Sequence, residues 1–541
     1  MVINMRLDKT GLQEREAWKA LGYHVPSYDR EQLTENTKKN PEWIHFGAGN
    51  IFRAYQANLM QQLMEEGKSD TGLIVAEGFD YEIIEKMYRP HDDYSILVTL
   101  KGNGEVEKTV IGSIVESLIL DSENDEEFSR LKEIFAAPSL KMASFTITEK
   151  GYSLVDGKGD TLPAVARDLE NGPVKPESYL GKVCALVYER YLNGQLPLAL
   201  VSMDNCSHNG DKLKAAVTAF AEAWVKAGTA EAGFLEYVND TAKLTFPWSM
   251  IDKITPRPDP KVEAILEADH IEGLEKAVTS KNTWVAPFVN AEECQYLVIE
   301  DAFPNGRPAL EETGVIFTAR ETVDKVEKMK VCTCLNPLHT TLAVFGCLLG
   351  YELISEEMKN PALKKLVEKI GYQEGLPVVV NPQILEPKQF IDEVLQMRIP
   401  NPFMPDTPQR IATDTSQKLS IRFGETIKAY MASEDLDVNT LEGIPMVFAG
   451  WLRYLMGVDD NGKTFTPSPD PLLETLMPLL ADVKLGEACD VKAVTAPILK
   501  RADIFGVDLT QNVLGEKVTA LFGEMIEGVG AVAKVLERLN Q

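Results

Sequence analysis

The fold of the N-terminal half is decided by the stretch WIHFGAGNIFRAYQANLMQQLMEEG, residues 43–67. Its first four residues suit a buried strand, and a Gly-x-Gly turn follows at Gly47 and Gly49. Apolar residues at 59, 60, 63 and 64 then have the spacing of one helix face. A second apolar run, LIVAEGFD at 73–80, completes the pattern of strand, turn, helix and strand. We therefore expect a βαβ unit of a doubly wound parallel sheet.

The remaining apolar runs predict two domains of different character. Runs at 94–100, 142–147 and 198–203 predict further strands of the same sheet, with helices at 178–194 and 211–227. After residue 300 the runs carry helical periodicity, and DAFPNGRPALEETG at 301–314 has the Pro and Gly content of a connection. The prediction is an α/β Rossmann-type N-terminal domain at 41–300 and a mostly α-helical C-terminal domain at 301–541, preceded by an N-terminal extension at 1–40.

Composition excludes several classes of partner. The formal net charge of −27 over 541 residues argues against nucleic acid and anionic membranes. The chain contains no uncharged apolar run of about 18 residues, so we expect no membrane span. The N-terminus lacks the apolar core of a signal peptide, and the seven cysteines are sparse and odd in number. We expect reduced thiols and a cytoplasmic location.

The glycine turn at 47–49 predicts a dinucleotide site, because it lets the backbone approach a pyrophosphate at a helix N-terminus. The strand-turn-helix context favours this over a purely structural turn, although Phe52 replaces the usual third glycine. Glu77 and Asp80 follow the second strand and favour NAD over NADP by bonding a ribose, the alternative being ordinary surface carboxylates. The candidate cofactor-binding residues are Gly47, Gly49, Asn50, Phe52, Arg53, Glu77, Asp80 and Glu149.

The sequence KVCTCLNPLH, residues 330–339, places a lysine, an asparagine and a histidine inside an apolar run. A buried lysine is suited to moving protons, and an amide and an imidazole can hold an oxygen that gains charge. This combination indicates interconversion of an alcohol and a ketone, with a hydride carrier bound elsewhere. Cys332 and Cys334 lack the second ligand pair of a zinc site, so core thiols are favoured and no metal is expected.

Polar residues elsewhere suggest ligand contacts. Asn205 follows a buried strand, where a polar residue acts either in a turn or on a ligand. Asp252 lies in an apolar setting between two prolines, where a capping role is the alternative. A candidate anion-binding element follows a Pro-rich loop and consists of Arg410, Lys418 and Arg422. The alternative is that these basic side chains are simply exposed to water on a helix face.

Six segments occur in an order that resembles the long-chain mannitol dehydrogenase family, the polyol-specific dehydrogenases. They are HFGAGNIFRA, TITEKGY, MDNCSHNG, FPWSMIDKITP, YLVIEDAFPNGRP and the stretch from Glu327 to His339. The resemblance implies metal-independent catalysis with NAD. It also implies that Lys330 is the general acid/base, Asn205 and Asn336 bond the reacting oxygen, and His339 orients the substrate. It places Asp252, Arg410 and Lys418 in the pocket and Glu327 near the proton path.

One departure from the family pattern affects this element. The family has four residues between the lysine and the asparagine, whereas five separate Lys330 from Asn336 here. One extra residue in a regular helix would rotate the lysine by about 100°. We expect Asn336 to cap a helix whose first residue is Pro337, with the lysine on a preceding turn reset by a bulge or break.

Among the family's reactions, the resemblance favours NADH-dependent reduction of D-fructuronate to D-mannonate. A uronate carries a carboxylate, which Lys418 and Arg422 would bind. Tagaturonate reduction and mannitol oxidation at carbon 2 are the alternatives within the family, and a non-catalytic dinucleotide-binding protein is the alternative from another class. In each enzymatic case the partner is a small sugar acid or polyol.

Overall fold

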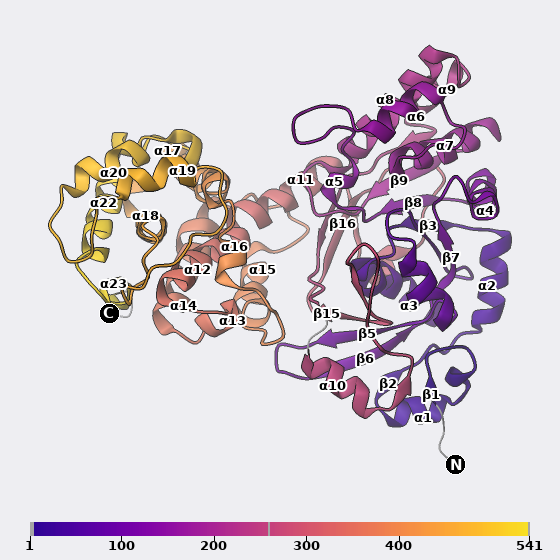
Figure 1. Ribbon diagram of the computed structural model, residues 1–541, viewed down its shortest axis with the longest axis horizontal. Helices are drawn as coiled ribbons and strands as arrows, with labels where there is room; N and C mark the ends of the chain where they lie inside the picture. The colour runs from indigo at the N-terminus through magenta and orange to yellow at the C-terminus, as the bar shows by residue number, and fades with distance from the viewer. Residues whose placement is uncertain (1–4, 258–259, 539–541) are drawn as a thin grey trace. The chain divides into compact units, whose positions relative to one another are not determined.

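The computed structural model describes residues 5–257 and 260–538. The chain divides into two compact units. Unit 1 comprises Met1–Lys101 and Glu105–Asp324, and unit 2 comprises Gly102–Gly104 and Lys325–Gln541. All labelled strands fall in the indigo-to-magenta part of the chain, and the orange and yellow part is helical (Figure 1). This confirms the predicted fold class, a Rossmann-type N-terminal domain and a helical C-terminal domain.

Six parallel strands form the central sheet of unit 1, in the order β10-β9-β8-β3-β4-β7. Their bounds are β3 (Trp43–Phe46), β4 (Leu73–Glu77), β7 (Ile114–Ile119), β8 (Met142–Phe145), β9 (Leu198–Ser202) and β10 (Leu244–Thr245). This is the doubly wound order of a dinucleotide-binding fold. The order reverses between β3 and β8, so their carboxyl ends flank the switch point where ligands bind in such sheets.

Alternate side chains of these strands enter two hydrophobic cores, because successive residues of a strand point to opposite faces. Ile44 and Phe46 of β3 join the core beneath the helices of one face, and Trp43 joins the other core. The helices of the first face are α4 (Asp125–Ala136), α6 (Pro163–Asn171), α7 (Tyr179–Leu192), α8 (Asn209–Ala227) and α9 (Gly233–Asn239). The other face is covered by α3 (Ala57–Glu65) and a second sheet. Burial on both faces explains the continuous apolar runs.

The second sheet has the order β15-β5-β6-β2. Its strands are β2 (Tyr23–His24), β5 (Ser95–Leu100), β6 (Val106–Ile111) and β15 (Phe288–Glu292). The expectation that residues 94–100 continue the doubly wound sheet is therefore wrong. β5 pairs antiparallel with β6 because the few residues joining them allow a hairpin, whereas a parallel connection needs a crossover of a dozen or more residues.

Short strand pairings join segments of unit 1 that lie far apart in the sequence. Residues 1–40 include α1 (Arg15–Ala20) and α2 (Arg30–Lys39), and β1 (Met5–Arg6) pairs with β12 (Ile271–Glu272). A third sheet joins β11 (Ser249–Asp252), β16 (Tyr296–Glu300) and β17 (Ile316–Thr318). The pairing of β17 with β16 places residues 301–324 in unit 1, although their sequence suggests the helical domain. The remaining elements are α5 (Thr148–Gly151), α10 (Pro260–Ala268) and the hairpin β13 (Ala277–Val278) and β14 (Trp284–Val285).

Unit 2 is built around α18 (Gly443–Leu455), whose residues are all buried. α18 packs against α12 (Asn336–Leu349) and α22 (Val513–Met525). The helices are α12 (Asn336–Leu349), α13 (Ile354–Glu357), α14 (Pro361–Glu368), α15 (Pro387–Glu393), α16 (Pro408–Ile411), α17 (Glu425–Ala432), α18 (Gly443–Leu455), α19 (Leu473–Leu476), α20 (Val491–Leu499), α21 (Ala502–Phe505), α22 (Val513–Met525) and α23 (Ala531–Glu537).

A helical run extends from Arg320 to Leu349, through α11 (Arg320–Met329) into α12. By length and composition alone it could cross a membrane, since the mean hydropathy of its most apolar window is 1.4. Within the protein, however, 78% of that window is buried. This is the pattern of a core helix, as its packing against α18 and α14 also indicates.

Candidate active site

The turn after β3 has a backbone that only glycine adopts readily. Gly47 has a φ of +109°, and a Cβ atom there would lie 2.2 Å from the carbonyl oxygen of Thr146 at the end of β8. By contrast, no heavy atom lies within 4 Å of the Cβ position of Gly49. A helix begins at Asn50, so its first N–H groups have no partner within the helix. Open space beside a helix N-terminus fits a pyrophosphate.

The next two candidate residues, Phe52 and Arg53, face the protein interior. The ring of Phe52 stacks on His45 of β3 at 4.3 Å, which is the close helix–strand packing that a third glycine would otherwise serve. Burial lowers the pKa of His45 to about 3, so the imidazole is neutral. The Arg53 guanidinium donates to the carbonyl of Ala286 at 2.6 Å and to Oδ1 of Asn50 at 2.9 Å. Phe52 and Arg53 therefore support the glycine turn from the side that faces the protein interior.

Glu77 ends β4 and organises two loops. One carboxylate oxygen accepts from the backbone N–H of Ala48 at 2.8 Å, and the other from Phe79 at 2.7 Å and Asp80 at 3.0 Å. Asp80 is buried and accepts from the hydroxyl of Thr279 at 2.7 Å. Both carboxylates thus have partners inside the protein, close to the glycine turn.

The carboxyl ends of β8 and β9 are joined by Asp204. Its carboxylate accepts from the N–H groups of Ile147 and Thr148, both at 2.9 Å, and from the hydroxyl of Tyr152 at 2.5 Å. Burial raises the pKa of Asp204. Asn205 follows with an exposed side chain, whereas Glu149 lies on the surface in an ion pair with Lys212 at 3.0 Å.

Asn209 was missed by sequence reasoning, although it lies in the quoted segment MDNCSHNG. Its buried amide donates to the carbonyls of Ser202, Asp204 and Ser249, at 3.2, 3.0 and 3.0 Å. Its Oδ1 accepts from the N–H of Ser249 at 3.0 Å and of Gly210 at 2.8 Å. Asn209 therefore fixes the end of β9 and the start of α8 to β11, the strand that ends in Asp252.

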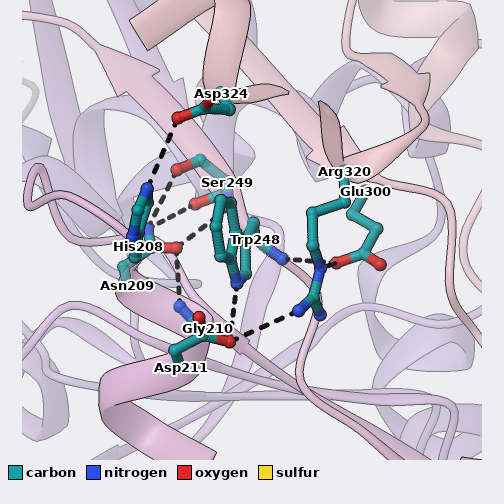
Figure 2. Close-up of polar contacts among 9 residues, drawn as sticks. All are labelled: His208, Asn209, Gly210, Asp211, Trp248, Ser249, Glu300, Arg320 and Asp324. Carbon is teal, nitrogen blue, oxygen red and sulfur yellow. Dashed lines mark hydrogen bonds and ion pairs between the residues drawn. The ribbon is translucent and has the colours of Figure 1, made fainter. Parts of the chain in front are cut away.

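Figure 2 shows a second group that sequence reasoning missed, centred on Trp248. The ring of His208 stacks on Trp248 at 4.2 Å, and the Arg320 guanidinium lies 4.8 Å from the Trp248 ring. Trp248 donates through Nε1 to Asp211 at 2.9 Å, and Arg320 pairs with Glu300 at 3.0 Å. The group connects the start of α8, β11 and β16 to the first residue of α11.

Asp252 is buried at the end of β11, opposite Tyr296 in the antiparallel register. Tyr55 lies near it, and the pKa of Tyr55 is raised by burial and then by the charges of Asp252 and Tyr296. Lys253, the next residue in the chain, donates a hydrogen bond to the backbone carbonyl of Glu292 at 2.8 Å. Asp252 is therefore a buried carboxylate that lies near the Tyr55 side chain.

In unit 2, Lys330 is 4% exposed and begins a π-helical turn, Lys330–Cys334. The N–H of Leu335 donates to the carbonyl of Lys330 at 3.1 Å, the five-residue bond of a π bulge. α12 begins directly after Leu335, with the N–H of His339 donating to the carbonyl of Leu335 at 3.1 Å. A π bulge adds one residue to a helical turn, so it accommodates the extra residue between Lys330 and Asn336.

The expectation that Asn336 caps a new helix is wrong. Leu335 occupies the cap position, and no side chain caps the helix there. Leu335 has φ −130° and ψ −61°, so one non-helical residue separates the π turn from α12. Pro337, which has no N–H to donate, lies in the first turn after the bulge, where that loss is tolerated. Glu327 is half-buried one turn before Lys330.

The three basic candidates of unit 2 lie in different surroundings. Arg422 donates to the hydroxyl of Thr340, the residue after His339, and burial lowers the pKa of Arg422 to about 10. Lys418 donates to the carbonyl of Thr413, and its pKa is lowered by burial and by the charge of Arg422. The structure thus brings Lys418 and Arg422 close to each other and places Arg422 against Thr340. Arg410 is 63% exposed and forms an ion pair with Asp406.

The seven cysteines, Cys332 and Cys334 among them, are thiols that form no disulfide. Burial raises the pKa of Cys332 to about 11 and of Cys334 to about 12. Within residues 5–257 and 260–538, no group of three or more His, Cys, Asp or Glu residues is arranged to hold a metal ion.

A doubly wound unit with a glycine turn, joined to a helical unit with a buried lysine, defines the class: a dehydrogenase of the Rossmann type. The chain belongs to the mannitol dehydrogenase family. Residues 41–312 match the mannitol dehydrogenase Rossmann domain, and residues 322–525 match the mannitol dehydrogenase C-terminal domain.

Two curated relatives and one solved structure illustrate the similarity. The chain is 53% identical to the D-mannonate oxidoreductase of Thermotoga maritima, over 99% of each chain. It is 28% identical to the D-mannonate oxidoreductase of Escherichia coli, over 93% of this chain and 95% of that one. Its fold matches the Pseudomonas fluorescens mannitol 2-dehydrogenase in ternary complex with NAD and D-mannitol, with a TM-score of 0.68, 26% identity and 99% coverage of both chains.

Proposed function

We propose that the protein catalyses the NAD-dependent, metal-independent and reversible reduction of D-fructuronate to D-mannonate. The observation that carries the proposal is the 53% identity, over the whole chain, to a D-mannonate oxidoreductase. The position of Arg422 and Lys418 beside the helix of His339 supports a substrate that carries a carboxylate. The seven cysteines, none of which is in a disulfide, support a cytoplasmic enzyme.

The chain's own residues have distinct roles in this proposal. The nicotinamide cofactor, when bound, supplies the hydride in reduction and accepts it in oxidation. Lys330 donates a proton to the substrate oxygen as that oxygen gains charge, and takes the proton back in the reverse direction. The Asn336 amide donates a hydrogen bond to the same oxygen, and His339 orients the substrate. The roles of Asn205, Asp252, Arg410 and Glu327 remain those implied by the family resemblance.

The carboxylate of a uronate separates the proposed substrate from a polyol. The Arg422 guanidinium is largely buried, so a bound carboxylate would interact with it under weak solvent screening. Mannitol and fructose offer no such anion. Loss of Arg422 is therefore expected to affect uronate reduction more than reduction of a neutral ketose.

The discriminating experiment measures NADH oxidation with D-fructuronate, D-tagaturonate and D-fructose. We expect the highest kcat/KM with D-fructuronate. A preference for fructose would refute the uronate assignment while leaving the family intact. Absence of turnover with all three, together with retained NADH binding, would favour a non-catalytic dinucleotide-binding protein.

A pair of variants tests the role of the cation. Arg422→Gln is expected to lower kcat/KM for D-fructuronate by about 10- to 100-fold, the range of a charge-assisted hydrogen bond. Lys428→Gln is the matched control, because it removes one positive charge from α17, where Lys428 forms a surface ion pair with Glu425 at 2.8 Å. Equal effects of the two variants would contradict a specific role for Arg422.

A further inference from the structure

The tip of the β13–β14 hairpin folds onto the loop that follows β4. The hydroxyl of Thr279 donates to Asp80 at 2.7 Å, and the ammonium of Lys281 donates to the carbonyl of Phe79. These contacts join residues about 200 positions apart in the sequence. The hairpin is therefore a fixed part of the surface at the carboxyl end of β4.

This location is the adenosine end of a doubly wound dinucleotide site. In such sheets the pyrophosphate lies over the first glycine turn, and the end of the second strand faces the adenosine ribose. β4 is that second strand, and Phe79 follows its last residue by two positions. Phe79 is 64% exposed, and the Lys281 ammonium lies 4.2 Å from the centre of its ring. A positive charge is thus held beside the expected position of the ribose.

At the carboxyl end of β4, the negative charge of the Glu77 carboxylate is compensated by hydrogen bonds more than its position in the sequence suggests. Its carboxylate is 5% exposed and accepts hydrogen bonds from three backbone N–H groups, those of Ala48, Phe79 and Asp80. Such bonds offset much of the repulsion that a free carboxylate would exert on a phosphate. Lys281, by contrast, has three N–H donors and gives one to the carbonyl of Phe79, so it can also bind an anion.

We propose that Lys281 is a cofactor-selecting residue that binds the 2′-phosphate of NADP(H), so that the enzyme accepts NADP(H) alongside NAD(H). The inference rests on the proposed function only in requiring a nicotinamide dinucleotide at the glycine turn. It assigns the discrimination between NAD(H) and NADP(H) to the hairpin. The motif around Glu77 would otherwise be expected to control that choice.

The test is the dissociation constant of NADH and of NADPH, followed by nicotinamide fluorescence without substrate. Lys281→Ala is expected to raise the dissociation constant for NADPH about five- to tenfold and that for NADH less than twofold. Rising salt should weaken NADPH binding by the wild type more than by the variant, because the screening length falls from about 10 Å at 0.1 M to about 3 Å at 1 M.

Lys276→Ala is the matched control from the same hairpin. Its ammonium lies 5.6 Å from the ring of Trp284 and forms an ion pair with Glu263 at 3.0 Å. It should leave the ratio of the two dissociation constants unchanged. Wild-type protein that binds NADH but not NADPH would overturn the inference, as would equal effects of Lys281→Ala on both. Failure of the wild type to bind either dinucleotide would instead refute the proposed function.

Discussion

The carboxyl group of Glu357 is buried without compensation in unit 2. The residue is fully buried on α13, and neither carboxylate oxygen has a hydrogen-bond partner in the described structure. One oxygen lies against α12, where a Cβ atom on Gly346 would be 2.2 Å from it. Burial raises the pKa of Glu357 from 4.5 to about 10, so the group is neutral in the folded protein at pH 7.

The raised pKa makes folding less favourable as the pH rises. Below pH 4.5 the carboxyl is protonated in both the folded and the unfolded chain, so it contributes no pH-dependent cost. Above that pH the unfolded chain ionises while the folded protein keeps the proton, until about pH 10. The cost grows by about 1.4 kcal/mol per pH unit and reaches about 3 kcal/mol at pH 7.

Glu357→Gln removes the ionisation while keeping the shape of the side chain. We expect this variant to unfold about 6–12 °C higher than the wild type at pH 7, since about 1 kcal/mol corresponds to about 2–4 °C for a domain of this size. Thermal unfolding followed at about pH 5, 7 and 8.5 should show the difference growing with pH.

The neighbouring glutamate provides the control for this experiment. Glu356 is exposed and pairs with Lys359 at 2.7 Å, so Glu356→Gln should change the stability by less than about 0.5 kcal/mol at every pH. A difference between Glu357→Gln and wild type that does not vary with pH would refute the reasoning. A variant less stable than wild type at pH 7 would show that the carboxylate is ionised and has a partner.

Three further predictions concern the proposed chemistry and the cofactor turn. Lys330→Ala should lower kcat by about 10²- to 10⁴-fold, the usual contribution of a general acid/base, while titration shows the affinity for NADH unchanged. Gly47→Ala should lower the melting temperature, because its φ is +109° and its Cβ would lie 2.2 Å from the Thr146 carbonyl. Gly49→Ala should keep the wild-type melting temperature but weaken NADH binding, since its methyl group would enter the open space expected to hold the pyrophosphate.

Much of unit 1 could be predicted because its signals are local. The run Trp43–Phe46 is a strand with the predicted bounds, and Gly47 has the positive φ that a tight turn requires. The adjacent helix shows its apolar face in the spacing of Leu59 and Leu63. Burial on both faces leaves a continuous apolar run in a parallel strand, so a short window is sufficient.

The partners of the polar side chains could not be predicted in the same way. The carboxylate of Glu77 lies 29 positions from Ala48 in sequence, and Asp80 lies 199 positions from Thr279. Periodicity shows that such residues are placed near strand ends, but it carries no information about which distant N–H or hydroxyl they meet. The same limit explains why Asn209, which connects three elements, was overlooked.

For the element that carries Lys330, sequence alone predicted the chemistry and posed the problem of spacing. Lysine, asparagine and histidine in an apolar run predict proton transfer to a held oxygen. Whether the extra residue would break the helix or widen one turn depends on packing, because both outcomes are compatible with the same local propensities. Tertiary structure decided this in favour of a π turn that leads, through Leu335, directly into α12, which is buried against α18.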